Sequence, residues 1–499
     1  MHSWSRDIDL HIKVRDLKFW EKDEVRKKLD ETLSFMTGDW NWNFKFYQHS
    51  GEIEYELFGD ETFVIESEKE TNVVLFSGGL DSLSGIIELL RTTDNQLCLV
   101  SHQSGNPSVG KVQNDLFDEI KMLYPGRCYH YKYECSLRGQ QSADETQRTR
   151  SFLFNSIAYT LASTYKLNEN ILFENAITSF NIAETQDMIN SRSSRTTHPK
   201  TLGLMSELMT MIHESEYKIK NRFYDKTKAD VIAVLKRYGH EKMLDIAVSC
   251  SGSRNKKNKH TTHCGICSQC IDRRFGAYYV EVEEEDENGI YDFDFVKEDL
   301  LEIKQKKAIS DYLLQARKYS KFSLEKFYDE FTDELTDLEE FFEGETEADK
   351  IQKIYNVCLR HGGQVEKAYN RMQLKNDGLN SKFRANSLFS LVLGMRTKED
   401  ILKPIKLNAE GIEKIDVPRR QLKILSASIY QNLLEKGEIG IKEKETKLNK
   451  GISNSVILEL EKEYKMDDKQ KNSIHEYFRK GLIEAKRKNG KIEVKTHAK

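Results

Sequence analysis

The order of apolar and polar positions changes its period along the chain. In the first seventy residues, apolar side chains alternate with polar ones over Ile8–Val14 and again over Trp40–Phe46, which is the two-residue period of a half-buried strand. Between these segments, Glu21–Met36 carries apolar residues at helical spacing. The stretch 1–71 is therefore predicted to be a small α+β module with its aromatic stripe in the core.

From Asn72 onward, short apolar segments alternate with amphipathic or apolar helices. Strands are predicted at Val73–Phe76, Leu97–Val100 and Ile171–Phe173. Helices are predicted at Ser82–Leu90, Gln113–Tyr124 and Ser151–Tyr165. Alternating β and α units are typical of a parallel sheet with helices on both faces. The fold class expected for 72–285 is thus a doubly wound parallel α/β sheet.

The chain changes again after the acidic run Glu281–Glu287, which is interpreted as a solvated boundary. The region 290–499 has apolar residues at helical spacing and is predicted to be mainly helical, with one or two subdomains. Near its end, Asn489-Gly490 could turn a basic hairpin that resembles the wing of a winged helix. A solvated basic tail is the interpretation favoured for this segment.

The overall charge narrows the classes of partner. The 499 residues include 77 Lys and Arg against 81 Asp and Glu, a net charge of −4. A basic footprint over the whole chain is absent, so nucleic-acid binding could arise only from a local patch. The sequence contains neither a signal-peptide core nor an apolar run of bilayer length, so a cytoplasmic protein with no membrane partner is expected.

The hexapeptide Ser77-Gly78-Gly79-Leu80-Asp81-Ser82 lies between a predicted apolar strand and a helix. Two glycines allow a close backbone approach to phosphates, and the helix N-terminus adds unsatisfied N–H groups and a positive dipole end. The hydroxyl groups can donate hydrogen bonds, and Asp81 can cap the helix or orient Mg²⁺. The whole loop is predicted to bind ATP, and a Walker-type loop is excluded because no Gly-Lys-Ser/Thr follows.

Four of the eight cysteines are clustered in sequence. Cys264, Cys267 and Cys270 form a Cys-x-x-Cys-x-x-Cys segment, and Cys250 lies upstream across the basic loop 254–259. Four thiolates suit a closed tetrahedral Zn²⁺ site with a structural role. An iron–sulfur cluster, or His260 or His263 in place of Cys250, remains an alternative.

Together these motifs resemble the QueC family of PP-loop ATP pyrophosphatases, which make 7-cyano-7-deazaguanine from 7-carboxy-7-deazaguanine. Further segments resemble the family in the same order: Arg150–Phe154, Lys226–Asp230, Ser249-Cys250, His263–Gly265 and Arg273-Arg274. The resemblance covers about 72–280 and implies a PP-loop, HUP-like fold with a zinc knuckle. It also implies ATP cleavage between the α and β phosphates, with the substrate carboxylate becoming an acyl-adenylate.

The sequence departs from this family where the substrate or the acceptor would bind. The family's Tyr-Pro-Asp-Cys-Arg loop is missing, and Arg192–Pro199 stands near its place. Such enlarged chains resemble the QueC-like proteins of bacterial anti-phage operons, the Qat and type IV CBASS systems. That resemblance implies an acceptor amine on a partner protein's N-terminus. The region 290–499 is then expected to be a docking platform that is separable from adenylate formation.

The remaining candidate residues follow the loop and the zinc segment. Arg150 and Lys228 are candidates to act with Asp81 on phosphate charge, although Lys228 could simply be an exposed helix residue. His102 follows the second strand of the predicted sheet, where ligands bind in open α/β sheets. Weaker candidates, for binding the substrate or acting as general base, are Glu174, Asn175, Arg195 and His198. Arg138 and Arg148 are as readily a solvated surface as an anion site.

The function expected from sequence is therefore an ATP-dependent ligase, with Zn²⁺ and Mg²⁺ as cofactors. It adenylates the carboxylate of a deazaguanine and passes the acyl group to an amine, here a partner protein's N-terminus in anti-phage defence. Three alternatives stay open: a 7-cyano-7-deazaguanine synthase that uses ammonia, a tRNA-modifying PP-loop enzyme, and a nucleotide-sensing protein without turnover.

Overall fold

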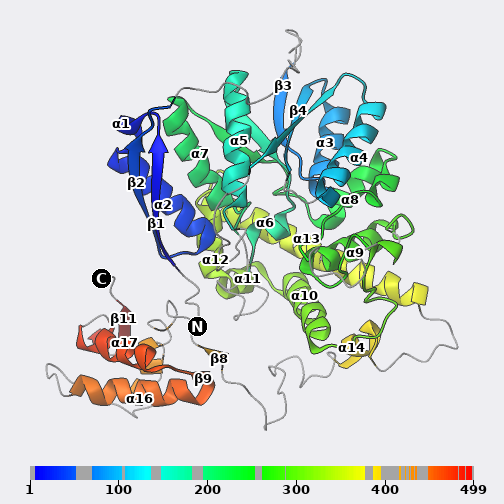
Figure 1. Ribbon diagram of the computed structural model, residues 1–499. Coiled ribbons are helices and arrows are strands. Elements are labelled where there is room, and N and C mark those ends of the chain that lie inside the picture. Colours follow the sequence, from blue (N-terminus) through cyan, green and yellow to red (C-terminus); the bar gives the residue numbers. More distant parts are fainter. Residues whose placement is uncertain are drawn as a thin grey trace. The chain divides into compact units, whose positions relative to one another are not determined.

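A computed structural model gives the fold of the chain (Figure 1). It describes residues 6–51, 70–103, 107–135, 148–182, 195–252, 261–286, 288–376, 386–394, 415–416, 422, 426–427, 429–431, 433–434, 448–480, 483–488 and 491–496. Contacts divide the chain into two compact units, 1–397 and 398–499. The first unit thus contains the predicted N-terminal module, the sheet and most of the predicted helical region.

The N-terminal module is a β-α-β unit, as the alternation predicted. Its elements are β1 (Asp7–Val14), α1 (Leu17–Trp20), α2 (Asp23–Thr37) and β2 (Asn41–Gln48). The two strands pair in parallel. Trp42 and Phe46 are buried, whereas Trp40 is 59% exposed, so the predicted aromatic core stripe is wrong at its first residue. Phe46 and the α2 face pack on Leu208 of α7, which attaches the module to the sheet domain.

The central sheet has five parallel strands in the order β5-β4-β3-β6-β7. Strand β3, the first of this sheet in sequence, lies at its centre. The chain proceeds from β3 through β4 to β5 at one edge, then returns to β6 beside β3 and ends with β7 at the other edge. This leaves a topological switch point between β3 and β6, where open α/β sheets bind ligands. The strands are β3 (Thr71–Leu75), β4 (Gln96–Gln103), β5 (Cys128–Glu134), β6 (Glu169–Leu172) and β7 (Lys218–Asn221).

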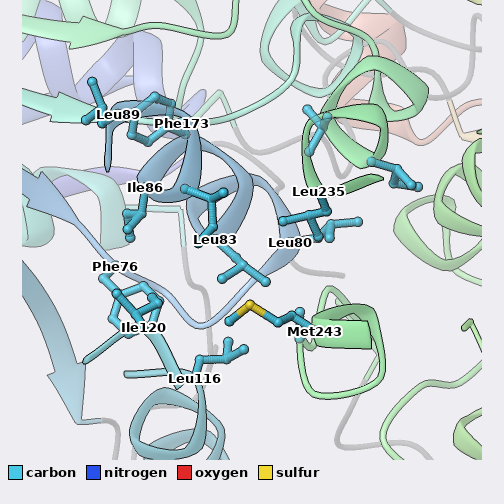
Figure 2. Packing of buried hydrophobic residues seen from close by; sticks show 14 of the residues in the cluster. Phe76, Leu80, Leu83, Ile86, Leu89, Leu116, Ile120, Phe173, Leu235 and Met243 are labelled. Atoms are coloured by element: carbon cyan, nitrogen blue, oxygen red, sulfur yellow. The ribbon is translucent and has the colours of Figure 1, made fainter. Parts of the chain in front are cut away.

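Helices cover both faces of the sheet, which confirms the predicted layers (Figure 1). Val74 faces α3, α4 and α8, whereas its neighbour Val73 faces α5 and α7, as the two-residue period of a strand requires. In Figure 2, Leu83 and Ile86 of α3 point into the first of these layers, beside Phe173 and Phe76. The helices are α3 (Leu80–Thr92), α4 (Pro107–Leu123), α5 (Arg150–Thr164), α6 (Ala176–Phe180), α7 (Pro199–His213), α8 (Lys228–Arg237), η2 (Glu241–Leu244) and α9 (Ser268–Val280).

The helical region that follows is continuous with the sheet domain. Tyr312 of α10 and Val365 of α13 share one apolar cluster with Phe275 of α9, and Phe327 of α11 shares another with Phe180 of α6. The helices of this region are η4 (Asn288–Ile290), α10 (Ile303–Lys321), α11 (Leu324–Glu330), α12 (Thr332–Glu339), α13 (Glu347–Asn376) and α14 (Leu388–Gly394). Residues 303–376 therefore share apolar clusters with the sheet domain, and the expectation that adenylate formation survives their removal stays a prediction.

The acidic run 281–287 is not a solvated linker over its described part, 281–286. Asp286 is fully buried, and its Oδ1 accepts a 2.8 Å hydrogen bond from Nε of Arg273. Arg274 donates to the backbone carbonyl of Asp286 at 2.8 Å, and Tyr291 donates to both of its carboxylate oxygens. Burial opposes ionisation, but Arg273 and Arg274 hold the pKa of Asp286 below its usual value. The run thus ends in a buried ion pair at Asp286, while Glu281 and Glu284 remain exposed.

The second unit contains helical residues between 422 and 434 and a helix pair followed by a hairpin. Its other elements are β8 (Ile415–Asp416), α16 (Leu448–Glu463), β9 (Tyr464–Lys465), α17 (Asp468–Arg479), β10 (Ile483–Lys488) and β11 (Lys491–Thr496). Strands β10 and β11 pair antiparallel on either side of positions 489 and 490. The hairpin possibility is therefore confirmed, and the favoured solvated tail is wrong. Among the helices in the described ranges, none combines the length and apolarity needed to cross a membrane.

Candidate nucleotide and metal site

The glycine loop joins β3 to α3 at the switch point. Gly78 has φ +78°, a conformation that side chains disfavour, and a Cβ there would meet Gln113 Cγ at 3.2 Å. Gly79 is the N-cap of α3 and offers no capping side chain. The first-turn N–H groups of Asp81 and Ser82 therefore lack both an intrahelical acceptor and a side-chain cap. Such groups, at the positive end of a helix, suit an anionic ligand.

Asp81 bonds groups outside its own helix, so of the two roles that the sequence allowed, capping α3 or orienting Mg²⁺, the first is not seen. Its Oδ2 accepts a hydrogen bond from the ammonium group of Lys228, the first residue of α8. Its Oδ1 accepts from both the backbone N and the Nδ2 of Asn175, each at 3.1 Å. Loop, β6 and α8 thus meet at one carboxylate. Lys228 has no exposed side-chain surface, so it is not the exposed helix residue that the sequence allowed.

Two further carboxylates act on this pair. Burial first, and then the charge of Asp81, raises the pKa of Glu174 from 4.5 to about 8. Burial opposes the charged form of Lys228, yet Asp81, Glu174 and Asp272 together raise its pKa. Asp272, on α9, also accepts a 2.8 Å hydrogen bond from the hydroxyl of Tyr312 on α10. One buried lysine therefore lies among three acidic groups, which is the environment that perturbs proton affinities at reactive sites.

The segment before the first cluster cysteine binds the glycine loop directly. Ser249 Oγ accepts the N–H of Leu80 at 3.0 Å, and the N–H of Val248 donates to the Gly78 carbonyl at 3.1 Å. Cys250 follows immediately. A metal ion that holds the four cysteines in place would therefore also hold the N-terminus of α3 in place.

The four cysteines converge as predicted. The sulfur atoms of Cys250, Cys264, Cys267 and Cys270 all lie within 4.8 Å of one another. Cys267 and Cys270 Sγ are 3.4 Å apart, and Cys264 and Cys270 Sγ are 4.0 Å apart. Four sulfurs at about 2.3 Å from a tetrahedral Zn²⁺ would be separated by about 3.8 Å, so the group fits a metal such as zinc.

Local backbone geometry holds this knuckle in place. Gly265 has φ +82°, and a Cβ there would lie 1.8 Å from the carbonyl oxygen of Phe293, so only glycine fits. His263 does not join the sulfurs, because its Nε2 faces the Ser249 N–H and the Arg273 guanidinium while its Nδ1 bonds Thr262. His260 and the basic loop 254–259 lie outside the described residues.

Helix α13 clamps the start of α8 next to Lys228. Thr227 and Asp230 form a capping box, in which Thr227 Oγ1 accepts the Asp230 N–H and Asp230 Oδ2 accepts the Thr227 N–H. Gln364 bonds both partners: its Oε1 accepts from Thr227 Oγ1 at 2.5 Å and its Nε2 donates to Asp230 Oδ1 at 2.8 Å. Arg360 adds a 3.0 Å bond to Asp230 Oδ2.

His102, near the carboxyl end of β4, and Arg150, at the start of α5, both contact the ring of Phe154. The ring of Phe154 lies 5.4 Å from the His102 ring, and the Arg150 guanidinium lies 5.4 Å from the same phenyl centroid. His102 Nδ1 is buried without a hydrogen-bond partner in the described structure. Gln113 of α4 reaches the carbonyls of His102 and Ser77 at 3.5 Å and links this cluster to the loop.

Arg195 and His198 lie elsewhere, against the N-terminal module. Both rest on Phe35, with the Arg195 guanidinium 4.6 Å from the ring centroid and the His198 ring 5.2 Å away. His198 Nδ1 accepts the Lys200 N–H and so caps α7. Burial, followed by the charges of Arg195 and Lys200, lowers the pKa of His198 to about 3. Arg148 donates to the Thr37 carbonyl at 2.6 Å, while Arg138 and Arg192 lie outside the described residues.

Sequence reasoning therefore found Asp81, Lys228, Asn175 and Glu174, which the structure brings together. It missed the contributions of Gln113, Asp272 and Gln364, which sit within helices as ordinary polar residues and carry no motif. Comparison with known protein families and with curated protein sequences gives no match for this chain.

Proposed function

We propose that this chain is an ATP-dependent adenylating enzyme of the PP-loop class. The observation that carries the proposal is the Asp81–Lys228 ion pair next to the N-terminus of α3, whose N-cap Gly79 has no capping side chain, at the switch point of a parallel sheet. A buried lysine and the first-turn N–H groups of Asp81 and Ser82 together suit a polyphosphate. The hydroxyls of Ser77 and Ser82 lie in the same loop, where they bond each other and the backbone of Gly79. The resemblance of Ser77–Ser82 to the PP-loop supplies the expectation of cleavage between the α and β phosphates.

In the proposed reaction, a substrate carboxylate attacks the α-phosphorus of ATP. The bond between that phosphorus and the bridging oxygen breaks, and pyrophosphate leaves with the electron pair. The N–H groups of Asp81 and Ser82 and the ammonium of Lys228 stabilise the charge that develops on pyrophosphate. Asp81 and Asn175 keep Lys228 in place before the substrate arrives. Mg²⁺, when bound to the phosphates, would supply further charge neutralisation.

The second half of the reaction transfers the acyl group to an amine and releases AMP. The attacking nitrogen must lose a proton, and Glu174 is the proposed general base because a carboxyl of pKa about 8 can accept one from an ammonium-like intermediate. The resemblance of the motifs to QueC supplies the substrate class, a carboxylated deazaguanine. It also supplies the acceptor of the favoured hypothesis, the N-terminal amine of a partner protein in anti-phage defence.

The metal proposed for the four-cysteine group is Zn²⁺ with a structural role, because four sulfur ligands leave no open position for water. Cys250 would hold it one residue from Ser249, which binds the loop. The ion would thus stabilise the nucleotide site without taking part in a chemical step.

The test is product analysis with ATP as substrate. We expect AMP and pyrophosphate from the full chain, and a loss of about a hundredfold or more in rate for Asp81→Asn. Asparagine is used because its amide oxygen can still accept the hydrogen bond of Lys228, whereas alanine would also leave the buried ammonium without that acceptor. Asp115→Asn on α4, whose carboxylate forms an exposed ion pair with Lys111, is the matched control and should retain activity. ADP and phosphate as the only products would refute the class.

A further inference from the structure

The second unit contains two consecutive helices whose connection, which begins with strand β9 (Tyr464–Lys465), has the length found in a helix-turn-helix motif. Helices α16 and α17 are joined by the four residues 464–467. A capping box fixes where α17 begins: Asp467 Oδ1 accepts the Gln470 N–H at 2.7 Å, and Gln470 Oε1 accepts the Asp467 N–H at 2.9 Å. The second helix of such a pair is the one that enters a DNA groove in proteins that use the motif.

The unit has a core of its own that orients this helix. Val456 and Leu460 of α16 pack with Ile474 and Phe478 of α17, and Ile483 of β10 belongs to the same cluster. Polar links reinforce the packing. Ser453 Oγ lies 2.6 Å from His475 Nδ1, Lys471 pairs with Glu461 at 2.5 Å, and the Val494 N–H donates to Gln431 Oε1 at 3.1 Å. Helix pair and hairpin therefore share one apolar core.

The hairpin gathers positive charge at its turn. Lys486, Arg487, Lys488 and Lys491 fall within six residues, and Lys488 stands opposite Lys491 in the strand register. Lys486 stands opposite Glu493 in the same register, whereas the Lys488–Lys491 pair places like charges opposite each other, which does not favour pairing of the strands. A polyanion beside the hairpin would offset the repulsion.

The charge of the whole unit follows the same trend. Residues 398–499 hold 24 Lys and Arg against 17 Asp and Glu, whereas residues 1–397 hold 53 against 64. The second unit thus has a net charge of +7 and the first a net charge of −11, so the total of −4 does not reveal the basic second unit. On α17, Lys469 and Asn472 are exposed, and these are residue types that contact phosphates and base edges.

We propose that the second unit binds duplex DNA, with α17 in the major groove and the β10–β11 hairpin against the phosphate backbone. An α-helix fits that groove in width, and the short hairpin directly after it would extend the contact along the duplex. This activity is separate from nucleotide chemistry in the first unit and does not rest on it.

The test measures binding of the full-length chain to a fluorescent 20-base-pair duplex across a salt series. Replacing Lys486, Arg487, Lys488 and Lys491 with Gln should reduce the steepness of log K against log salt by up to about 3.6, the value for four phosphate contacts. The matched control, with Lys442, Lys444, Lys447 and Lys450 replaced by Gln, removes the same charge before and at the start of α16. It should retain most of the slope.

The outcomes separate the alternatives. Weak or absent duplex binding by the unaltered chain overturns the proposal, and so does an equal loss in the two variants. Competition by unlabelled tRNA that is stronger than by the same duplex also overturns it, in favour of an RNA site. Formation of AMP from ATP should be equal in the unaltered chain and the hairpin variant. Because DNA binding is measured without ATP turnover, the binding result can be interpreted even if no AMP is formed.

Discussion

Lys228 occupies a position that is unfavourable for a cation. It is the first residue of α8, where the helix dipole is positive, and its side chain is wholly buried. Asp81 offsets both penalties, and Glu174 and Asp272 add negative charge nearby. An arrangement that places a cation at the positive end of a helix gains from an anionic ligand. We interpret the charge arrangement as preparation for pyrophosphate.

Glu174 makes the account testable by pH. As a general base it must be ionised, so the rate of acyl transfer should rise with pH through about 8 and then level off, because burial and Asp81 raise its pKa to that value. Glu174→Gln should remove this limb and lower the plateau by about a hundredfold. The exposed Glu216→Gln is the control. A profile of the same shape in Glu174→Gln would show that another group is the base.

The same shift has a consequence for stability, with a definite sign. A carboxyl whose pKa is raised on folding binds its proton more tightly in the folded state, so the free energy of unfolding should fall as pH rises from about 4.5 to about 8. Glu174→Gln should flatten this slope in chemical denaturation curves. An unchanged slope would contradict the burial assigned to this side chain.

Cys267 tests the metal site. Elemental analysis should find one zinc per chain, and Cys267→Ser should lose it and lower the free energy of unfolding by about 3 kcal/mol or more. Acceptor specificity should not change, because the role proposed for the cluster is to hold Ser249, which binds the N–H of Leu80 in the loop. Cys98→Ser removes a buried thiol outside the cluster and should keep the zinc. Iron with acid-labile sulfide, or no metal, would contradict the assignment.

At the scale of elements, the strands that were correctly predicted from the sequence are the buried ones. Strands β3, β4 and β6, in the middle of the sheet, are continuous apolar runs and were predictable from pattern. The edge strands β5 and β7 were missed, because an edge strand mixes polar and apolar residues and loses the signal of two buried faces. The loop and the cysteine knuckle were predictable because their chemistry is local. The clamp on α8 was not, because Gln364 lies 137 residues from Thr227.

The clamp leads to a prediction for α13. Gln364→Ala removes the hydrogen bonds to Thr227, which precedes Lys228, and to Asp230, which follows it. Because Lys228 is then held less firmly, kcat for AMP formation should fall by about tenfold with little change in KM. Amide exchange at the first turn of α8 should accelerate in the same variant. Glu366→Ala changes an exposed side chain on the same helix and should do neither. Normal exchange with reduced activity would contradict a positioning role.

At the scale of the whole molecule, the helical region could be foreseen as helices but not placed. Helical periodicity shows that a helix has an apolar face, yet it does not show which surface that face covers. The acidic run looked like a linker because its charges were read without their partners. These are Arg273 and Arg274 for Asp286, and Arg371 and Lys375 for Glu283. The shared core of α9, α10 and α13 implies that ending the chain near residue 288 would remove part of the nucleotide site's support.

The acceptor is a question for the whole enzyme. If a protein N-terminus is the acceptor, peptides with a free α-amine should gain the mass of the acyl group when incubated with enzyme, ATP and carboxy-deazaguanine. The same peptides acetylated at the N-terminus, and free of lysine, should gain nothing. Conversion of the deazaguanine to its nitrile with ammonia as the main product, with no peptide modified, would favour the cyano-deazaguanine synthase.

The most direct test of the central claim is exchange of labelled pyrophosphate into ATP. Because an acyl-adenylate forms reversibly before any acceptor is needed, the account predicts exchange that depends on carboxy-deazaguanine and that is lost in Asp81→Asn. Exchange without the carboxylate would indicate a different first step. No exchange with the folded, zinc-containing full-length protein, under conditions where the deazaguanine and ATP both bind, would contradict the account.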